Sequence, residues 1–271
     1  MSSPTTMPAA FIGHGSPMNA LDPTNRYVDR WRAFGASVPR PRAIVVISAH
    51  WYINGTAVTA MAAPRTIHDF FGFPPELFAV RYPAPGDPDL AAEIAELAAP
   101  VWVGLDHDSW GFDHGAWSVL VHAFPDASVP VLQLSIDATK PLADHVALGA
   151  RLAPLRERDV LILGSGNIVH NLGRLDPGRP DEGFPSSVAF DDEAERLMTT
   201  TDPASIASLG EHPAYSAAVP TPEHLLPLMY IAGLAAAAGT PADLLVKGYA
   251  FGSLSMTSYI VGGADVTRRS S

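Results

Sequence analysis

The run Ala43-Ile44-Val45-Val46-Ile47-Ser48, which leads into Ala49-His50-Trp51, has apolar side chains at successive positions. A strand of this kind is typical of a parallel sheet that helices cover on both faces. Other short runs rich in apolar and β-branched residues have the same character, namely residues 9–12, 56–60, 129–134, 160–163 and 245–250. We therefore expect a sheet that is buried on both sides.

Segments with a helical spacing of apolar residues lie between these runs, at residues 25–32, 88–97, 145–155 and 191–198. Strands that alternate with helices predict a layered α/β fold. Residues 173–187 are rich in Gly, Pro and Asp, which is typical of a surface loop. This loop is too short to separate independent domains, so we expect a single domain over residues 1–271.

The composition excludes several classes of protein. The formal net charge of −11 argues against a nucleic-acid partner, which would need a basic face. The absence of cysteine excludes thiolate metal sites and cysteine nucleophiles, so any metal must be held by histidine or carboxylate. The longest apolar stretch, residues 225–239, is interrupted by Pro227 and is shorter than the roughly 20 residues of a membrane span. With no signal-peptide pattern at residues 1–10, we expect a cytoplasmic protein without a membrane partner.

Three of the ten histidines follow predicted strands. His14 stands between two glycines after residues 9–12, His50 follows residues 43–48, and His170 comes shortly after residues 160–163. Ligands of open α/β sheets bind beyond the carboxyl ends of the strands, and neutral imidazole is the commonest metal ligand. The alternatives are a solvated turn histidine for His14 and a core histidine for His50. The glycines at 164 and 166 match neither phosphate-binding motif, so we exclude nucleotide binding and leave an acid/base role open for His170.

Two further histidines have settings that allow two interpretations. His114 lies among aromatic residues and glycines, where it could line a pocket, or where it or Asp113 could cap a helix over 117–123. His224 is expected in the first turn of a helix with Thr221 as its N-cap, either as a metal ligand or as a capping residue. The remaining histidines are expected on the surface or in loops, namely His68, His107, His122, His145 and His212.

Nine short blocks along the chain, in order, resemble the 4,5-DOPA extradiol dioxygenase family, within the class III (LigB-type) extradiol ring-cleaving dioxygenases. The blocks are residues 13–18, 48–51, 66–70, 82–86, 111–117, 133–136, 164–171, 220–224 and 252–256. The resemblance implies a three-layer α/β/α fold with a central mostly parallel or mixed sheet. It also implies one non-haem divalent metal and the cleavage of a catechol, such as DOPA, by O₂ to a muconic semialdehyde.

The resemblance implies roles for the five histidines. His14, His50 and His224 match the metal-ligand positions, His170 matches an acid/base beside the metal, and His114 matches a pocket histidine that contacts the substrate. The wider superfamily uses two histidines and a carboxylate, whereas the third position here is a histidine. Two histidines and a carboxylate are typical of Fe(II) oxygenases, and three histidines are typical of zinc. We therefore expect Fe(II) for activity, while Zn(II) can occupy the site in purified protein.

Two other functions stay open at this point, a zinc-dependent hydrolase on the same scaffold and a non-catalytic binding module. Arg65 and Arg81 are candidates for binding a substrate carboxylate, or for surface salt bridges. A set of aromatic residues could form pocket walls or belong to the core, namely Trp51, Trp110, Phe112 and Trp117.

Overall fold

The computed structural model describes residues 6–262, in which ten strands are assigned. Eight of them form one sheet, and two form a separate short pair. The strands are β1 (Ala9–Gly13), β2 (Ala43–Ile53), β3 (Thr56–Thr59), β4 (Val103–Asp106), β5 (Val131–Asp137), β6 (Val160–Gly166), β7 (Asp243–Val246), β8 (Tyr249–Ala250), β9 (Leu254–Ser255) and β10 (Ser258–Val261). The main sheet has the order β4-β3-β5-β2-β6-β1-β10-β7, and β8 pairs with β9.

The centre of the sheet is parallel and its flanks are mixed. Strands β5, β2, β6 and β1 run in parallel, as do β3 and β4. The pairs β3–β5, β1–β10 and β10–β7 are antiparallel. The prediction of a mostly parallel or mixed sheet is therefore confirmed. Residues 43–48 lie in the middle of the sheet, where Ala43–Ile47 are buried as a parallel sheet requires.

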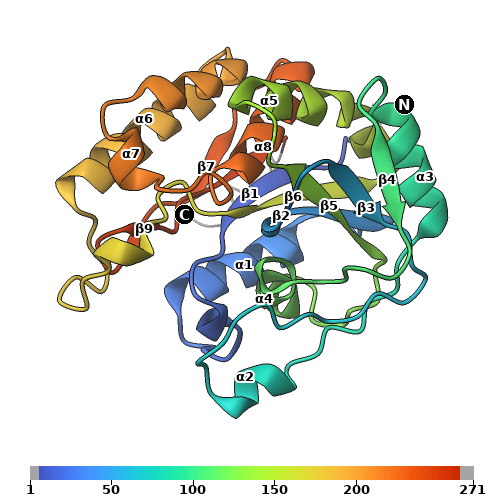
Figure 1. The fold of residues 1–271 in the computed structure, drawn as a ribbon, viewed down its shortest axis with the longest axis horizontal. Coiled ribbons are helices and arrows are strands. Elements are labelled where there is room, and N and C mark those ends of the chain that lie inside the picture. The colour runs from blue at the N-terminus through green and yellow to red at the C-terminus, as the bar shows by residue number, and fades with distance from the viewer. Residues whose placement is uncertain (1–5, 263–271) are drawn as a thin grey trace.

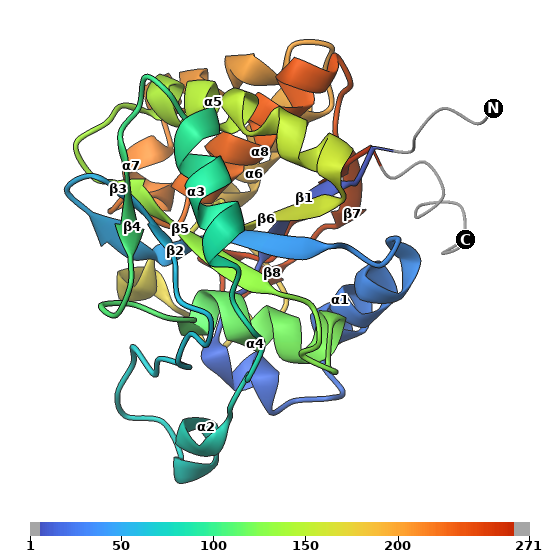
Figure 2. The ribbon, with the colours of Figure 1, turned by 90° about the vertical axis from the view of Figure 1, so that its right-hand side faces the viewer.

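Helices cover both faces of the sheet (Figures 1 and 2). The α-helices are α1 (Arg26–Ser37), α2 (Pro75–Ala79), α3 (Pro88–Leu97), α4 (His114–Ala123), α5 (Leu142–Arg151), α6 (Pro185–Met198), α7 (Tyr215–Ala218) and α8 (Leu226–Ala238). Short 3₁₀ helices are η1 (Pro17–Ala20), η2 (Ala153–Arg158), η3 (Leu172–Arg174) and η4 (Pro203–Glu211).

Two apolar cores, one on each face, make the fold three-layered. One core joins residues of α3, α5, α6 and α8 to one face of the sheet, and includes Ile94 and Tyr230. The other joins α1 and α4 to the opposite face, and includes Trp31 and Trp117. Figure 1 shows α5 and α8 on one side of the strands and α1 and α4 on the other. The predicted three-layer α/β/α class is confirmed.

The predicted elements differ from the observed ones mainly near the ends of the sheet. The helix over 88–97 is α3, with the same bounds, whereas α6 begins at Pro185 and so takes the last residues of the predicted loop 173–187. The single strand expected over 245–250 is wrong, because the chain is divided there between β7 and β8. The division falls at Gly248, where a Cβ would stand 2.2 Å from Tyr27 Oη.

None of the helices within residues 6–262 combines the length and the apolar character that a membrane crossing requires.

Candidate metal centre and catalytic site

Five histidines from five segments meet at the carboxyl edge of the central strands. His14 follows β1, His50 belongs to β2, His170 follows β6, His114 is the first residue of α4, and His224 precedes α8. The ring centroids are 5.1 Å apart for His14 and His50, 3.8 Å for His50 and His114, and 5.4 Å for His14 and His224. His170 stacks on His224 at 3.4 Å with an interplanar angle of 4°. The structure thus brings together all the histidines that the sequence analysis singled out.

The strand register explains why two of these rings meet. Gly13 of β1 is opposite Gly166 of β6, and Ser48 of β2 is opposite Ser165, so the three strands reach this edge together. His50 lies inside β2 rather than after it, since that strand continues to Ile53. The β2–β5 register shifts between Ile47 and Tyr52, across His50. Such irregularities redirect side chains and are frequent beside active sites.

Two glycines let the other segments approach. A Cβ on Gly166 would stand 2.1 Å from the carbonyl oxygen of His224, so only glycine lets the 224 loop lie against the end of β6. A Cβ on Gly115 would stand 2.4 Å from Ser48 Oγ and 2.9 Å from His50 Cδ2. These close approaches place the N-terminus of α4 against β2 and the 224 loop against the end of β6.

The hydrogen bonds around His14 and His50 direct their Nε2 atoms toward each other. Ser165 Oγ donates its one proton to the Gly115 carbonyl, so it accepts from His14 Nδ1, 3.0 Å away. Nδ1 of His50 lies 3.2 Å from Asp69 Oδ2. The two Nε2 atoms are 3.2 Å apart. Metal-binding histidines usually give their second ring N–H to such outer acceptors, so this donor pair fits a metal ion.

His224 offers a third nitrogen to the same place. One ring nitrogen from each of His14, His50 and His224 lies within 4.8 Å of the others. Nδ1 of His224 is 3.2 Å from Glu223 Oε1, which also accepts from Thr221 Oγ1. The prediction that His224 lies in the first helical turn with Thr221 as N-cap is wrong, because α8 begins at Leu226. Within residues 6–262, His50–Asp69–His114 and His170–Glu223–His224 are the other groups that could hold a metal.

Burial lowers the pKa of four histidines of the centre, which are His14, His50, His170 and His224. It is the largest cause that lowers the pKa of His50 to about 3 and that of His170 to about 4. It also lowers the pKa of His14 and of His224 well below the usual value, and the neighbouring histidines add to the effect. Neutral imidazole is the form that binds a metal, so these side chains need not lose a proton at neutral pH.

Two carboxylates lie beside His114, and no functional role was predicted for either from the sequence: Asp113 is buried and Asp69 is half-buried. Asp113 is the N-cap of α4, as one reading of the sequence predicted, and it also accepts from Ser48 Oγ and Gln133 Nε2. Burial, together with the nearby Asp69, raises the pKa of Asp113 to about 6. Burial opposes ionisation of Asp69 as well, but contacts with His114 and His50 outweigh it and lower its pKa to about 2. Asp69 lies in the block 66–70, which was the only signal for it.

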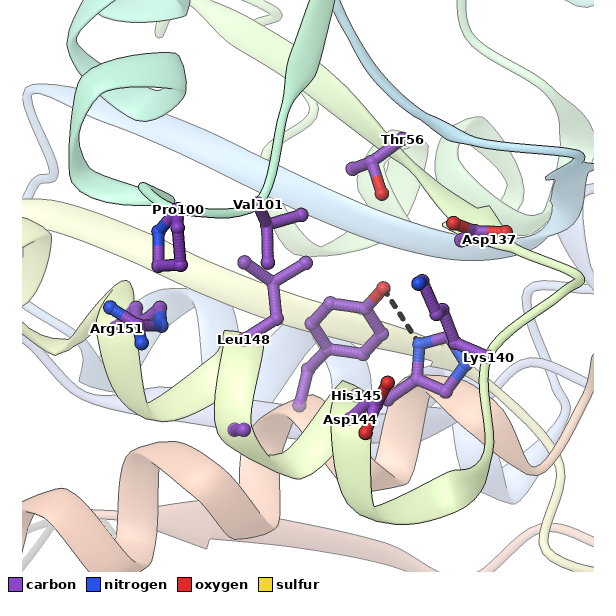
Figure 3. Close-up of a pocket in the computed structure, with 11 residues that line it drawn as sticks. Thr56, Pro100, Val101, Asp137, Lys140, Asp144, His145, Leu148 and Arg151 are labelled. Atoms are coloured by element: carbon purple, nitrogen blue, oxygen red, sulfur yellow. Dashed lines mark hydrogen bonds between the residues drawn. The ribbon is translucent and has the colours of Figure 1, made fainter.

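The histidines that we expected on the surface or in loops differ in their exposure. His107 is exposed, whereas the prediction for His145 is wrong because its side chain is buried. Nδ1 of His145 bonds Tyr230 Oη at 3.1 Å beside a cavity of about 170 Å³ (Figure 3). This cavity is lined by α5 and by residues of β3, β5 and α8, and none of the five central histidines borders it. His145 lies in α5 and packs against Tyr230 of α8. The sequence around a single polar residue in an amphipathic helix did not indicate that it would be buried.

The aromatic and arginine candidates have mostly structural settings. Phe112 and Trp117, the latter within α4, are buried in the core on the α1 and α4 side of the sheet, and Trp51 stacks on Trp110. Phe70, which the sequence analysis did not single out, lies edge-on to His114 at 5.5 Å. Arg65 and Arg81 are exposed, and their guanidinium groups donate to backbone carbonyls. Within residues 6–262, neither forms an ion pair with a carboxylate.

The chain is similar to known proteins over most of its length. Residues 8–262 match the family model described as the catalytic LigB subunit of aromatic ring-opening dioxygenase. The chain is 46% identical to a 4,5-DOPA dioxygenase extradiol of Escherichia coli (strain K12), over 96% of both chains. It is 37% identical to a protein of the same name from Beta vulgaris, over 92% of this chain and 94% of the other. A crystal structure of an uncharacterized protein from Escherichia coli K12 superposes with a TM-score of 0.80 at 40% identity, covering 94% of this chain and 99% of that one.

Proposed function

The chain belongs to the LigB family of aromatic ring-opening dioxygenases and is an extradiol enzyme of the 4,5-DOPA dioxygenase type, and we propose that its five-histidine centre performs the reaction. His14, His50 and His224 bind one non-haem divalent metal, Fe(II) in the active enzyme. His170 is the acid/base, and His114 contacts the substrate. The substrate is a catechol with a DOPA-like side chain, which O₂ opens to a muconic semialdehyde.

The observation that carries the proposal is the shared direction of the His14 and His50 Nε2 atoms, 3.2 Å apart. Each ring has its Nδ1 beside an oxygen of the protein, Ser165 Oγ or Asp69 Oδ2, so its free nitrogen faces the other ring. His224 completes the set, with one ring nitrogen within 4.8 Å of those of His14 and His50. When bound there, Fe(II) would supply the positive charge that acidifies a catechol hydroxyl and the electron that O₂ needs to react.

His170 is the base that takes a proton from the catechol hydroxyl. Its ring stacks on that of His224, which keeps it within the centre. The low pKa that burial causes leaves His170 unprotonated at neutral pH, so it can accept a proton and return it to an oxygen of the opening ring. Glu223, one residue from His224, favours the charged form that His170 passes through.

His114 holds a substrate oxygen by a hydrogen bond. It is the first residue of α4, at the end of the helix where the helix dipole is positive. Its backbone N–H is taken by Asp69 Oδ1 at 2.9 Å, which fixes the start of the helix. Phe70, edge-on to His114, supplies an aromatic surface next to the substrate ring.

The relatives' names support a DOPA-like substrate. We also propose that residues 1–271 act as one catalytic domain in the cytoplasm. Both apolar cores flank the same sheet, which supports one domain. The net charge of −11 supports small-molecule partners, a catechol and O₂, rather than nucleic acid.

The test is reconstitution of metal-free protein with Fe(II), followed by addition of L-DOPA in air. We expect stoichiometric O₂ uptake and a yellow ring-opened product, with a higher kcat/KM for L-DOPA than for 4-methylcatechol. The Zn(II) form is the matched control, since zinc has no redox chemistry and should consume no O₂. Absence of O₂ uptake with every catechol, or hydrolysis by the Zn(II) form alone, would contradict the proposal.

A further inference from the structure

Asp69 lies between two histidines that have different tasks. Its Oδ2 is 3.2 Å from Nδ1 of His50, and its Oδ1 is 3.0 Å from Nδ1 of His114. The same Oδ1 accepts the backbone N–H of His114 at 2.9 Å. The side chain of Asp69 is 15% exposed, so water competes little for these contacts. One carboxylate therefore touches a proposed metal ligand and a proposed substrate contact.

We propose that Asp69 is a positioning residue that orients His50 toward the metal and His114 toward the substrate at the same time. This inference rests on the function proposed above for His50 and His114. Asp69 does not bind the metal that we assign to His14, His50 and His224, because it meets His50 at Nδ1 whereas His14 faces the Nε2 of that ring. The carboxylate and the metal are thus on different edges of the imidazole.

The contact with His50 has a known chemical consequence. A carboxylate that accepts the Nδ1–H of a metal-binding histidine fixes its tautomer and ring angle and makes Nε2 a better donor. Removing such a partner lowers metal affinity by about 10- to 100-fold.

The contact with His114 differs in geometry. Nδ1 of His114 is buried and forms no well-aligned hydrogen bond, although Asp69 Oδ1 is within 3.0 Å. The carboxylate is therefore the polar group beside a buried ring nitrogen that has no other partner within residues 6–262.

The loop that carries Asp69 is itself anchored. Ile67 N donates to Phe112 O at 2.7 Å, and Phe112 N donates to Arg65 O at 2.8 Å, which ties the loop to the segment that leads into α4. Trp117 Nε1 donates to Ile67 O at 2.8 Å from within α4. These bonds fix the Asp69 backbone relative to His114, as a positioning role requires.

The experiment compares Asp69→Asn with Asp137→Asn. The amide keeps the size of Asp69 and one accepting oxygen, but it puts donors where an imidazole N–H must be accepted. Asp137 is a buried carboxylate at the end of β5 that accepts the N–H groups of Gly55 and Thr139 and touches none of the five histidines. Each metal-free variant is titrated with Zn(II) against a competing chelator, and its thermal midpoint is measured to verify folding.

We expect Asp69→Asn to bind Zn(II) about 10- to 100-fold more weakly than the unmodified protein, and Asp137→Asn to bind it normally. The second measurement is kcat at saturating Fe(II) for His114→Ala in both backgrounds. If Asp69 orients His114, this substitution lowers kcat less in the Asp69→Asn background than alone, because residues that act through one another are not additive.

Two results would overturn the inference. Unchanged Zn(II) affinity in Asp69→Asn would remove its role toward His50, and an equal loss of kcat on His114→Ala in both backgrounds would remove its role toward His114. The Zn(II) titration needs no turnover, so a failure of the proposed dioxygenase activity is distinguishable from a failure of this inference.

Discussion

Gly166 at the end of β6 offers a direct test of how the centre is assembled. In Gly166→Ala the new Cβ would stand 2.1 Å from the His224 carbonyl oxygen, whereas ordinary contacts begin at 3.4 Å. The Cβ is fixed in place by the backbone of residue 166, and the oxygen belongs to the backbone of His224, so no rotation of a side chain can relieve the overlap. The 224 loop must therefore retreat by about 1 Å, and it carries the third proposed ligand.

The expected losses follow from that displacement. A misplacement of about 1 Å at a catalytic group lowers the rate about 10²-fold, and overpacking of this kind destabilises a fold by about 1–3 kcal/mol. We expect Gly166→Ala to weaken Zn(II) binding, to lower kcat by about that factor and to lower the free energy of unfolding.

The assays are a chelator-competition titration, O₂ uptake with L-DOPA and denaturant unfolding. Gly173→Ala is the matched control, because its new Cβ would come no closer than 3.4 Å to Asn171 Oδ1. If Gly166→Ala kept normal metal affinity and normal kcat, the argument that this glycine seats the 224 loop would be refuted.

Three other outcomes are expected. His170→Ala should keep its metal but lose turnover by roughly 10² to 10⁴, the usual contribution of acid–base catalysis; a normal rate of catechol cleavage would remove His170 from that role. His14→Ala, His50→Ala and His224→Ala should each lose most bound metal by elemental analysis, and full occupancy in any one would exclude that residue as a ligand. The pKa of Asp113, raised by burial to about 6, means that its carboxyl stabilises the metal-free fold most when it is protonated. We therefore compare the free energy of unfolding of the unmodified protein with that of Asp113→Asn. The difference, unmodified minus variant, should decrease as the pH rises from about 4 to about 6, and a difference that does not change with pH would contradict this.

The central strands were predictable because their signal is local. Residues 43–48 and 160–163 are apolar at successive positions, and both lie in the buried parallel part of the sheet. The edges were not predictable in this way. Neither the edge strand β4 nor β10, which lies next to the other edge strand β7, was predicted, and β7 was merged with β8 across Gly248. Short edge strands are defined by their partners more than by their own periodicity.

The site divides in a similar manner. His14, His50 and His170 were found from their places after strands, because parallel strands bring their carboxyl ends to one edge. His224 and His114 needed the family resemblance, since a loop and a helix start carry no spacing that points to a strand end. The error for His145 has the same origin, because a histidine in an amphipathic helix has no local mark of burial.

The sequence by itself determined the layered α/β class, the exclusion of thiolate chemistry and the set of histidines to examine. Only the tertiary structure decided which nitrogen of each ring is free. Ser165 Oγ and Asp69 come from residues that are 151 and 19 positions away from His14 and His50, and they turn the two Nε2 atoms toward each other. A histidine has two nitrogens, and its chemistry depends on which one is occupied by a neighbour that only the folded chain brings near.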